Sequence, residues 1–270
     1  MNTLWFCFPQ ETRRKLHGTP TDVQRKFRAL DKKGMVSQGM EMYLMPSRLA
    51  HDPGFTIEFI NRFSQLDFRT IHIGETDPDF LDTPETAGDL ARLADIVAML
   101  KSPAVLLHAH HLRDNRAQRA DLLRNSLPGT EILIENNGFD NEWGARPENV
   151  WTILQECPDF NLCMDIVHIK DFADIRLKDF TKPPILERIR EIHWSCSTYL
   201  MKGDPYESRG YQGYNPFHAL FPLTDITPSD STLEFIRQYP VVMEGVVPPE
   251  DSEYLFLSQE LEIILNGVPK

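Results

Sequence analysis

Short apolar runs alternate with longer amphipathic stretches along the whole chain. Several of these runs are almost continuous in hydrophobic residues, which is typical of parallel strands that are buried on both faces. We predict eight strands, at residues 4–8, 40–45, 70–74, 104–110, 131–136, 161–168, 191–195 and 241–245. Strands of this kind must be joined by crossover segments, because the end of one parallel strand is far from the start of the next.

The stretches between the strands have helical periodicity. Residues 84–100 follow a capping threonine and place Leu90, Leu93, Ala94 and Val97 on one face. Further helices are predicted at residues 147–157, 230–238 and 253–265, each with a proline, serine or glycine signal at one end. Eight strand–helix units in 270 residues predict an α/β fold, a (β/α)8 TIM barrel forming a single domain over residues 1–270. An open doubly wound sheet is the competing architecture, but no Gly-x-Gly-x-x-Gly turn follows the first strand.

A long segment at about residues 198–228 interrupts this alternation. It is rich in glycine, proline and tyrosine, and it follows the seventh strand. Long loops inside compact domains are usually functional, and loops after barrel strands lie on the face where barrel enzymes bind substrate. We therefore expect an active-site loop that forms a lid or a substrate wall.

Composition narrows the classes of partner. The chain is 41% hydrophobic with 16 Phe, enough for a large core, and its formal net charge is -12. This charge repels phosphate backbones, so we expect a small-molecule substrate and no nucleic acid. No apolar run reaches membrane-spanning length, and the apolar run at the N-terminus is too short for a signal peptide. With four cysteines and no Cys-x-x-Cys pair, we expect reduced thiols and a cytoplasmic location.

Metal-competent side chains stand at the carboxyl ends of consecutive predicted strands. Glu135, Asp165, His193 and Glu244 each follow an apolar run on strands five to eight. Such groups are costly to bury alone, but at a common rim they can share a cation. Mixed carboxylate and imidazole ligands favour a divalent cation, Mn, Mg, Co, Zn or Fe, without choosing among them. His72 at the end of the third strand and His108, His110 and His111 at the end of the fourth are further metal-competent side chains, and the alternation does not fix which of the last three faces the site.

These residues lie in motifs, ILIEN, CMDIVH, IHWS and VVMEG, that resemble the xylose isomerase-like TIM-barrel superfamily of sugar isomerases, sugar epimerases and endonuclease IV. The ketose 3-epimerase branch implies that Glu135, Asp165, His193 and Glu244 bind one metal and that His168 contacts the substrate. The endonuclease IV branch implies a second metal at His72 and His108. That branch also has an Asp-x-His pair after strand seven; here Asn215 and His218 are the nearest candidates, at a different spacing. Dimers are common among these enzymes, so a homodimer is one expectation.

The leading hypothesis is a metal-dependent isomerase or epimerase of a small sugar, polyol or hydroxycarbonyl compound. Glu135 and Glu244 would exchange protons with the substrate from opposite faces, and His168 would hydrogen-bond one of its oxygens. Arg209 could hold a carboxylate or phosphate, and Trp194 could stack on a sugar or pack in the core. The alternative is a two-metal phosphodiesterase resembling endonuclease IV. A binding protein on an inactive barrel is a third hypothesis, which a complete set of metal ligands disfavours.

Overall fold

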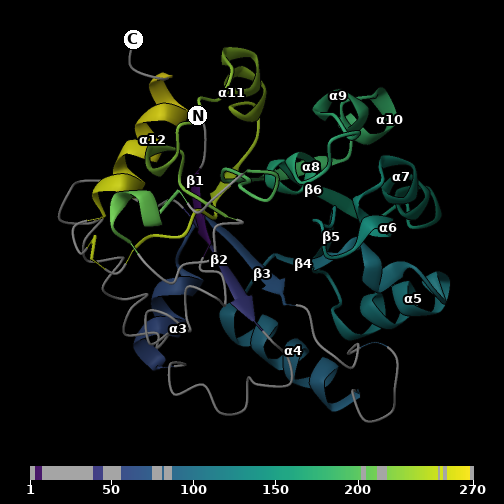
Figure 1. The fold of residues 1–270 in the computed structure, drawn as a ribbon. Helices are drawn as coiled ribbons and strands as arrows, with labels where there is room; N and C mark the ends of the chain where they lie inside the picture. Colours follow the sequence, from purple (N-terminus) through teal and green to yellow (C-terminus); the bar gives the residue numbers. More distant parts are fainter. Residues whose placement is uncertain are drawn as a thin grey trace.

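Eight parallel strands form a closed barrel, in the same order in space as in the sequence (Figure 1). The computed structural model describes residues 4–7, 39–44, 56–74, 81, 87–201, 205–211, 218–248, 250–251 and 254–267. The strands are β1 (Leu4–Cys7), β2 (Gly39–Leu44), β3 (Phe68–Ile73), β4 (Ala104–His108), β5 (Glu131–Glu135), β6 (Asn161–Asp165), β7 (Ile189–Trp194) and β8 (Val241–Met243). β1 pairs with both β2 and β8, which leaves no open sheet edge. The predicted TIM barrel is confirmed.

All eight predicted strands overlap observed ones, and β3 to β8 each end one to three residues earlier than predicted. After β4 the chain turns into the short 3-10 helix η3 (Ala109–Leu112), and after β6 into α8 (Ile166–Lys170). The side chain of Asp165 caps α8, because its Oδ1 accepts from the backbone N–H groups of Val167 at 2.6 Å and His168 at 3.2 Å. Residues 8 and 45, which the prediction included, lie outside the described part of the chain.

Helices surround the barrel on its outer side (Figure 1). They are α3 (Ile57–Ser64), α4 (Ala87–Leu100), α5 (Arg116–Ser126), α6 (Glu142–Ala145), α7 (Pro147–Glu156), α9 (Leu177–Phe180), α10 (Pro183–Leu186), α11 (Asp230–Ile236) and α12 (Leu255–Asn266). The predicted start of α7 at Pro147 is confirmed, and Ser229 caps α11 by accepting from Thr232 N at 3.2 Å. Residues 84–86 and 253 of the predicted helices are not described. None of the helices in the described ranges is long and apolar enough to cross a membrane.

The barrel wall separates two very different environments. Successive residues of a strand point to opposite sides, so Ile192 and Trp194 of β7 face the helices while Glu191 and His193 face the interior. The large apolar core lies between strands and helices. Inside the barrel the described apolar clusters are small: Ala104, Leu106, Leu133 and Cys163 form one, and Val242 with Phe68 forms another. The remaining interior positions therefore carry the polar side chains of the candidate site.

The described parts of the long segment after β7 are anchored to the barrel. Cys196 and Ala219 form an antiparallel bridge. Tyr206 is fully buried, donates its hydroxyl to the carbonyl of Val246 at 2.6 Å, and accepts from Leu220 N at 2.9 Å. The short helices η4 (Glu207–Arg209) and η5 (Phe221–Leu223) lie on either side of residues 212–217, which are not described. These contacts hold the described portions against the barrel, and the role of the segment as a lid or a substrate wall stays a prediction.

Candidate metal centre

The four predicted ligands converge inside the carboxyl end of the barrel. Glu135, Asp165, His193 and Glu244 are buried, and each offers a ligand atom within 4.8 Å of those of the other three. His193 Nδ1 lies 2.8 Å from Glu135 Oε1 and 3.1 Å from Glu244 Oε1. Strand register explains the meeting, because Asp165 pairs directly with His193 across β6 and β7. The sequence placed these residues at strand ends, and the closed barrel brings those ends together.

A second group of ligand atoms shares Glu135 with the first. His72 Nε2 lies 3.0 Å from Glu135 Oε2, and His108 Nε2 lies 3.3 Å from the same oxygen. The structure thus selects His108 among the three histidines left open by the sequence. His110 Nδ1 instead lies 2.8 Å from the side-chain amide of Asn137. His111 is buried in η3, outside the described groups of metal-competent residues.

A third group contains Asp165, His168 and His218. His168 Nδ1 lies 3.2 Å from Asp165 Oδ2 and 2.7 Å from the backbone carbonyl of Asn136. His218 Nδ1 lies 3.5 Å from Glu244 Oε2 and 3.2 Å from Ser195 Oγ. His218 thus reaches the centre although its sequence spacing differs from the Asp-x-His pattern of endonuclease IV. The Cys196–Ala219 bridge holds the chain next to it, and no local sequence signal announces this.

Two interior carboxylates were missed by the sequence analysis. Glu41 of β2 lies 3.0 Å from both His72 Nδ1 and His193 Nε2. Glu191 of β7 accepts from Thr70 Oγ1 at 3.1 Å, and its other oxygen lies 3.6 Å from His193 Nε2. Both precede the strand ends where ligands were sought. The usable signal was a single charged residue inside an otherwise apolar strand, as in GMEMYL.

Charge is unevenly distributed over the cluster. Burial alone would raise the pKa of Glu135, but His193, His72 and His108 draw it well below its usual range. Burial likewise opposes protonation of His72, yet Glu135 and Glu41 raise its pKa to about 10. By contrast, burial together with the neighbouring carboxylates of Glu244 and Glu135 raises the pKa of Asp165 to about 7. A cation among these oxygens would relieve the repulsion that Asp165 experiences.

Several buried oxygens also fit a metal ion. Glu135 Oε2, Asp165 Oδ2 and Glu244 Oε2 have no hydrogen-bond donor among the described residues. Buried acceptors without donors are costly, and a cation is the partner that satisfies several at once. The combination of carboxylate oxygens and imidazole nitrogens is compatible with Mn, Co, Zn or Fe, and also with Mg.

Two further residues predicted to bind substrate lie elsewhere. Trp194 is fully buried on the outer face of β7 and stacks on Phe221 with ring centroids 4.7 Å apart. This position corrects the sugar-stacking hypothesis in favour of core packing, because adjacent strand residues face opposite sides of the wall. Arg209 is exposed, donates from Nε to the carbonyl of Leu223 at 3.1 Å, and lies 3.7 Å from Asp225. Its predicted role in holding an anion stays a prediction.

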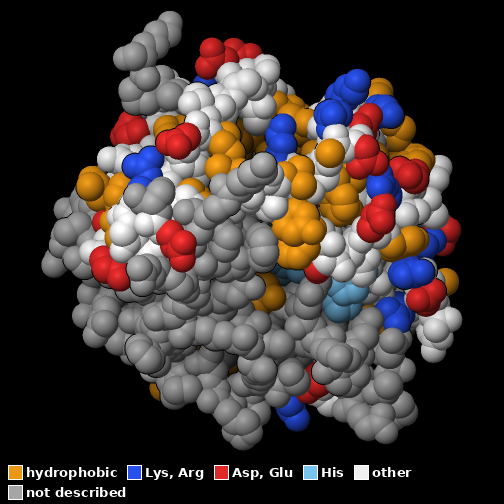
Figure 2. Space-filling model, viewed as in Figure 1, with side chains coloured by type: hydrophobic (Ala, Val, Ile, Leu, Met, Phe, Trp, Pro, Cys, Tyr) orange, Lys and Arg blue, Asp and Glu red, His pale blue; other side chains and the backbone are white. Residues whose placement is uncertain are grey.

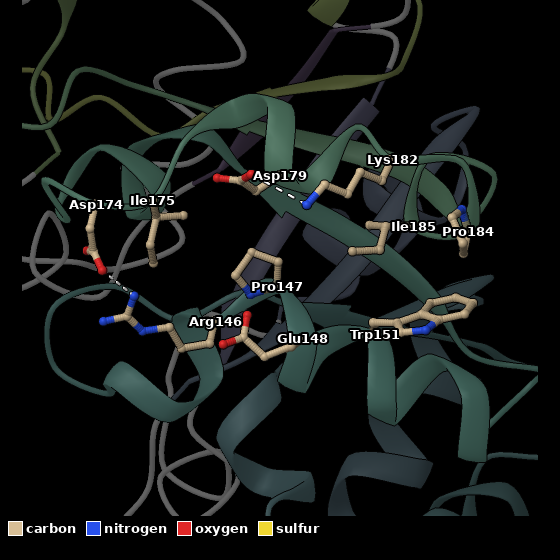
Figure 3. A pocket seen from close by; sticks show the side chains of 10 residues that line it. All are labelled: Arg146, Pro147, Glu148, Trp151, Asp174, Ile175, Asp179, Lys182, Pro184 and Ile185. Atoms are coloured by element: carbon tan, nitrogen blue, oxygen red, sulfur yellow. Dashed lines mark hydrogen bonds and ion pairs between the residues drawn. The ribbon is translucent and has the colours of Figure 1, made fainter.

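A separate cleft of about 430 Å³ lies outside the barrel, between α7 and the α9–α10 segment (Figure 3). Trp151 and Ile185 are among the residues that line it, and none of the metal-competent residues of the described chain does. The charges at its edge pair with one another, Arg146 with Asp174 at 2.6 Å and Lys182 with Asp179 at 3.6 Å. In the space-filling view, histidine side chains instead reach the surface near the middle of the face, beside hydrophobic ones (Figure 2).

No family model matches the sequence, and no curated protein matches it either. Solved structures do match over almost the whole chain. The probable 3-DHS dehydratase AsbF from Bacillus anthracis is 13% identical with a TM-score of 0.63, covering 98% of this chain and 99% of that one. Endonuclease IV from Thermus thermophilus is 16% identical with a TM-score of 0.56 (97% and 98% covered). The 3-keto-D-glucoside 4-epimerase YcjR from E. coli is 13% identical with a TM-score of 0.52 (98% and 99% covered).

Other matching structures are described as xylose isomerase domain or xylose isomerase-like proteins. At these identities the comparison concerns the fold. The predicted resemblance to xylose isomerase-like TIM barrels is thereby confirmed for the architecture, and the chemistry must be argued from the site itself.

Proposed function

We propose that the protein is a divalent-metal-dependent isomerase or epimerase of a small sugar, polyol or hydroxycarbonyl compound. The observation that carries the proposal is the convergence of Glu135, Asp165, His193 and Glu244, with two of the carboxylates beside one ring nitrogen of His193. These four residues would hold the cation. When bound, it would supply a Lewis acid that polarises a carbonyl group and acidifies the neighbouring C–H bond.

Glu135 and Glu244 are the groups suited to moving the proton. Each places one oxygen within 3.1 Å of His193 Nδ1 and retains a second oxygen, Oε2, without a hydrogen-bond donor in the described chain. A carboxylate with a free lone pair can accept a proton from carbon, and a carboxyl group can return it. We assign removal of the proton to one of these two carboxylates and its return to the other, on opposite faces of the substrate.

His168 would orient a substrate oxygen. Its Nδ1 donates to the carbonyl of Asn136 at 2.7 Å, and in the neutral ring this leaves Nε2 as an acceptor for a substrate hydroxyl. Asn136 also joins β5 to β6, because its side chain exchanges hydrogen bonds with the backbone of Asp165 at 2.9 and 3.0 Å. The ring orientation is therefore tied to the same strand ends as the ligands. The fold shared with a 3-keto-D-glucoside 4-epimerase supports this proposal.

A phosphoester hydrolase with two or more metals is the second candidate. It is favoured by the group formed by His72, His108 and Glu135, which adjoins the first, and by the group that includes His218. Adjacent cations can stabilise both the attacking and the leaving oxygen of a phosphoester. Endonuclease IV shares the fold, but the net charge of -12 opposes binding of a long polyanion.

Metal content and proton exchange separate the two candidates. Purified protein would be stripped with a chelator, reloaded with Mn²⁺, Co²⁺, Zn²⁺ or Mg²⁺, and analysed for bound metal. It would then be incubated in D₂O with a panel of ketoses and hydroxyketones. One equivalent of metal, and deuterium entering beside the carbonyl, would support the epimerase. Two or three equivalents with cleavage of bis(p-nitrophenyl) phosphate or an abasic duplex, and no deuterium exchange, would support the hydrolase instead. Glu260→Gln, a buried carboxylate outside the centre, is the matched control.

A further inference from the structure

Two carboxylates and two histidines form a closed ring inside the barrel. Glu135 contacts His72 Nε2 and His193 Nδ1, at 3.0 and 2.8 Å. On the opposite side, Glu41 contacts His72 Nδ1 and His193 Nε2, both at 3.0 Å. Each carboxylate therefore takes one nitrogen from each histidine. As a metal ligand an imidazole is neutral and carries one N–H and one lone pair, so each ring can donate to only one of the two carboxylates and presents its lone pair on the side of the other.

The two sides of this ring differ in their neighbours. Asp165, Glu244 and His108 gather on the Glu135 side, where Glu135 Oε2 has no hydrogen-bond donor among the described residues. On the Glu41 side, Oε1 and Oε2 each have a histidine nitrogen in hydrogen-bond geometry. Glu191 Oε1, 3.6 Å from His193 Nε2 on the Glu41 side, also lacks a donor, but the Glu135 side has more ligand atoms and therefore suits a cation better. The two oxygens of Glu41, which both have a histidine nitrogen in hydrogen-bond geometry, suit hydrogen bonds that orient the rings.

We infer that Glu41 is a positioning residue that fixes the tautomers of His72 and His193, so that both present their lone pairs to the metal groups on the Glu135 side. Histidine ligands commonly donate their second N–H to a carboxylate, which sets the ring orientation and strengthens the metal bond. Here one fully buried carboxylate serves a histidine of each of two adjacent groups. This inference rests on the proposed metal site and adds to it a coupling between the groups.

Substitution of Glu41 by glutamine should change which nitrogen of one histidine carries the proton. Glutamine has the shape of glutamate, but its side chain offers one acceptor oxygen and one NH₂ donor. In Glu41→Gln, the oxygen can accept from only one histidine. The amide NH₂ then faces the second ring, which must place its proton on the nitrogen that points to the metal. One of the two histidines therefore loses its ligand lone pair without any change in side-chain volume.

The experiment follows the histidine nitrogens directly. The full-length protein would be labelled with ¹⁵N-histidine and loaded with Zn²⁺, and long-range ¹H–¹⁵N correlation would report each tautomer. His72→Gln and His193→Gln assign the signals. We expect the Nδ1–H form at His72 and the Nε2–H form at His193. In Glu41→Gln we expect one of them to reverse and the Zn²⁺ affinity to fall by about 10–100-fold. Either ring in the opposite tautomer in Zn²⁺-loaded wild type would overturn the inference, even if Glu41→Gln fails to fold.

Two controls separate positioning from a general packing effect. Glu191→Gln removes a buried carboxylate that contacts His193 at 3.6 Å and accepts from Thr70, so His72 should retain its tautomer. Glu260→Gln removes a buried carboxylate on the outer side of the barrel wall and should leave the tautomers of His72 and His193 unchanged. If both controls reverse the tautomers as Glu41→Gln does, the positioning role is wrong. If Zn²⁺ binds and the tautomers contradict expectation, only the role of Glu41 fails. If wild type binds no divalent metal, the proposed centre fails with it.

Discussion

Glu135 and Glu260 are both fully buried carboxylates near β7, yet they occupy opposite chemical environments. Glu135 lies inside the barrel beside His193, and its pKa is held well below the usual range by that ring, His72 and His108, against the effect of burial. Glu260 of α12 lies behind the wall, on the side of Trp194, and accepts from Phe221 N at 2.8 Å. Burial raises its pKa to about 8.

The difference shows what burial alone does and what a site adds. Without a positive partner, a buried carboxyl group keeps its proton, since an isolated charge is costly in a medium of low dielectric. Inside the barrel, the histidines supply that partner. The histidines therefore keep Glu135 ionised in the interior, whereas burial and neighbouring carboxylates raise the pKa of Asp165 to about 7 and that of Glu191 to about 8.

The largest effect is expected from Glu135→Gln. Glu135 belongs to both adjacent metal groups and lies within 3.3 Å of three histidines. Removing its charge should lower metal affinity by more than about 100-fold at both groups. In chelator, unfolding free energy should fall by about 3–5 kcal/mol because buried partners lose their counter-charge. Glu244→Gln should leave the group formed by His72, His108 and Glu135 able to bind, because Glu244 is not part of it. Metal analysis measures the loss of binding, and urea titration measures the loss of unfolding free energy. Equal effects of Glu135→Gln and Glu244→Gln on metal binding would refute the position of Glu135 in both groups.

The next largest effect is the gain in stability expected when a divalent metal is added to protein stripped of metal. A ligand that binds only the folded state, at a free concentration of 100 times its Kd, raises the unfolding free energy by about 2.7 kcal/mol. For a chain of this length, that is a rise in Tm of roughly 5–10 °C. Thermal denaturation with and without metal tests this, with Glu135→Gln as the control that should show no rise. Equal rises in both proteins would place the metal outside the barrel interior.

The barrel itself was predictable because its strands are apolar on both faces, so runs such as residues 104–107 and 132–134 stand out without alignment. Ligands at strand ends were predictable for the same reason, since Glu135 or Glu244 follows such a run as its first charge. Glu41 was missed because it lies within its strand, where the position of a side chain depends on barrel closure. His218 was named only as a candidate at a different spacing from the Asp-x-His pair, because the Cys196–Ala219 bridge that places it is a contact distant in sequence.

The pattern of hydrophobic residues also did not predict the exact ends of the strands. Apolar residues continue through Ile166 and Val167, so the sixth run was interpreted as one strand to His168. The structure turns at Asp165, because its carboxylate caps α8. For Trp194, the sequence motif alone likewise did not establish which side of the barrel wall the side chain faces. Its place in the IHWS motif left sugar stacking and core packing both open, and strand alternation places it in the outer core.

Glu260 gives a pH-dependent test of the second environment. Its pKa is about 8 in the folded chain and 4.5 as the ordinary value, so the stability it supports is complete below about pH 4.5. That stability is lost as pH rises toward 8, because the unfolded chain ionises first. Between pH 6 and 7, wild type should lose about 1.4 kcal/mol that Glu260→Gln does not lose. Urea titration of both proteins at the two pH values gives this difference. Parallel pH profiles would show that Glu260 is not forced to keep its proton.

An effect of similar size is expected from Trp194→Phe, which tests whether the wall separates the two environments. Trp194 and His193 are consecutive, but Trp194 stacks on Phe221 in the outer core. Replacing the indole by a smaller ring should cost about 1–2 kcal/mol of unfolding free energy through lost packing. Metal affinity and any proton-exchange activity should be unchanged, since the ring does not face the interior. Urea titration and metal titration of the same preparation measure both quantities. If stability held while substrate KM rose, the tryptophan would contact substrate after all, and the two sides of β7 could not be treated as independent.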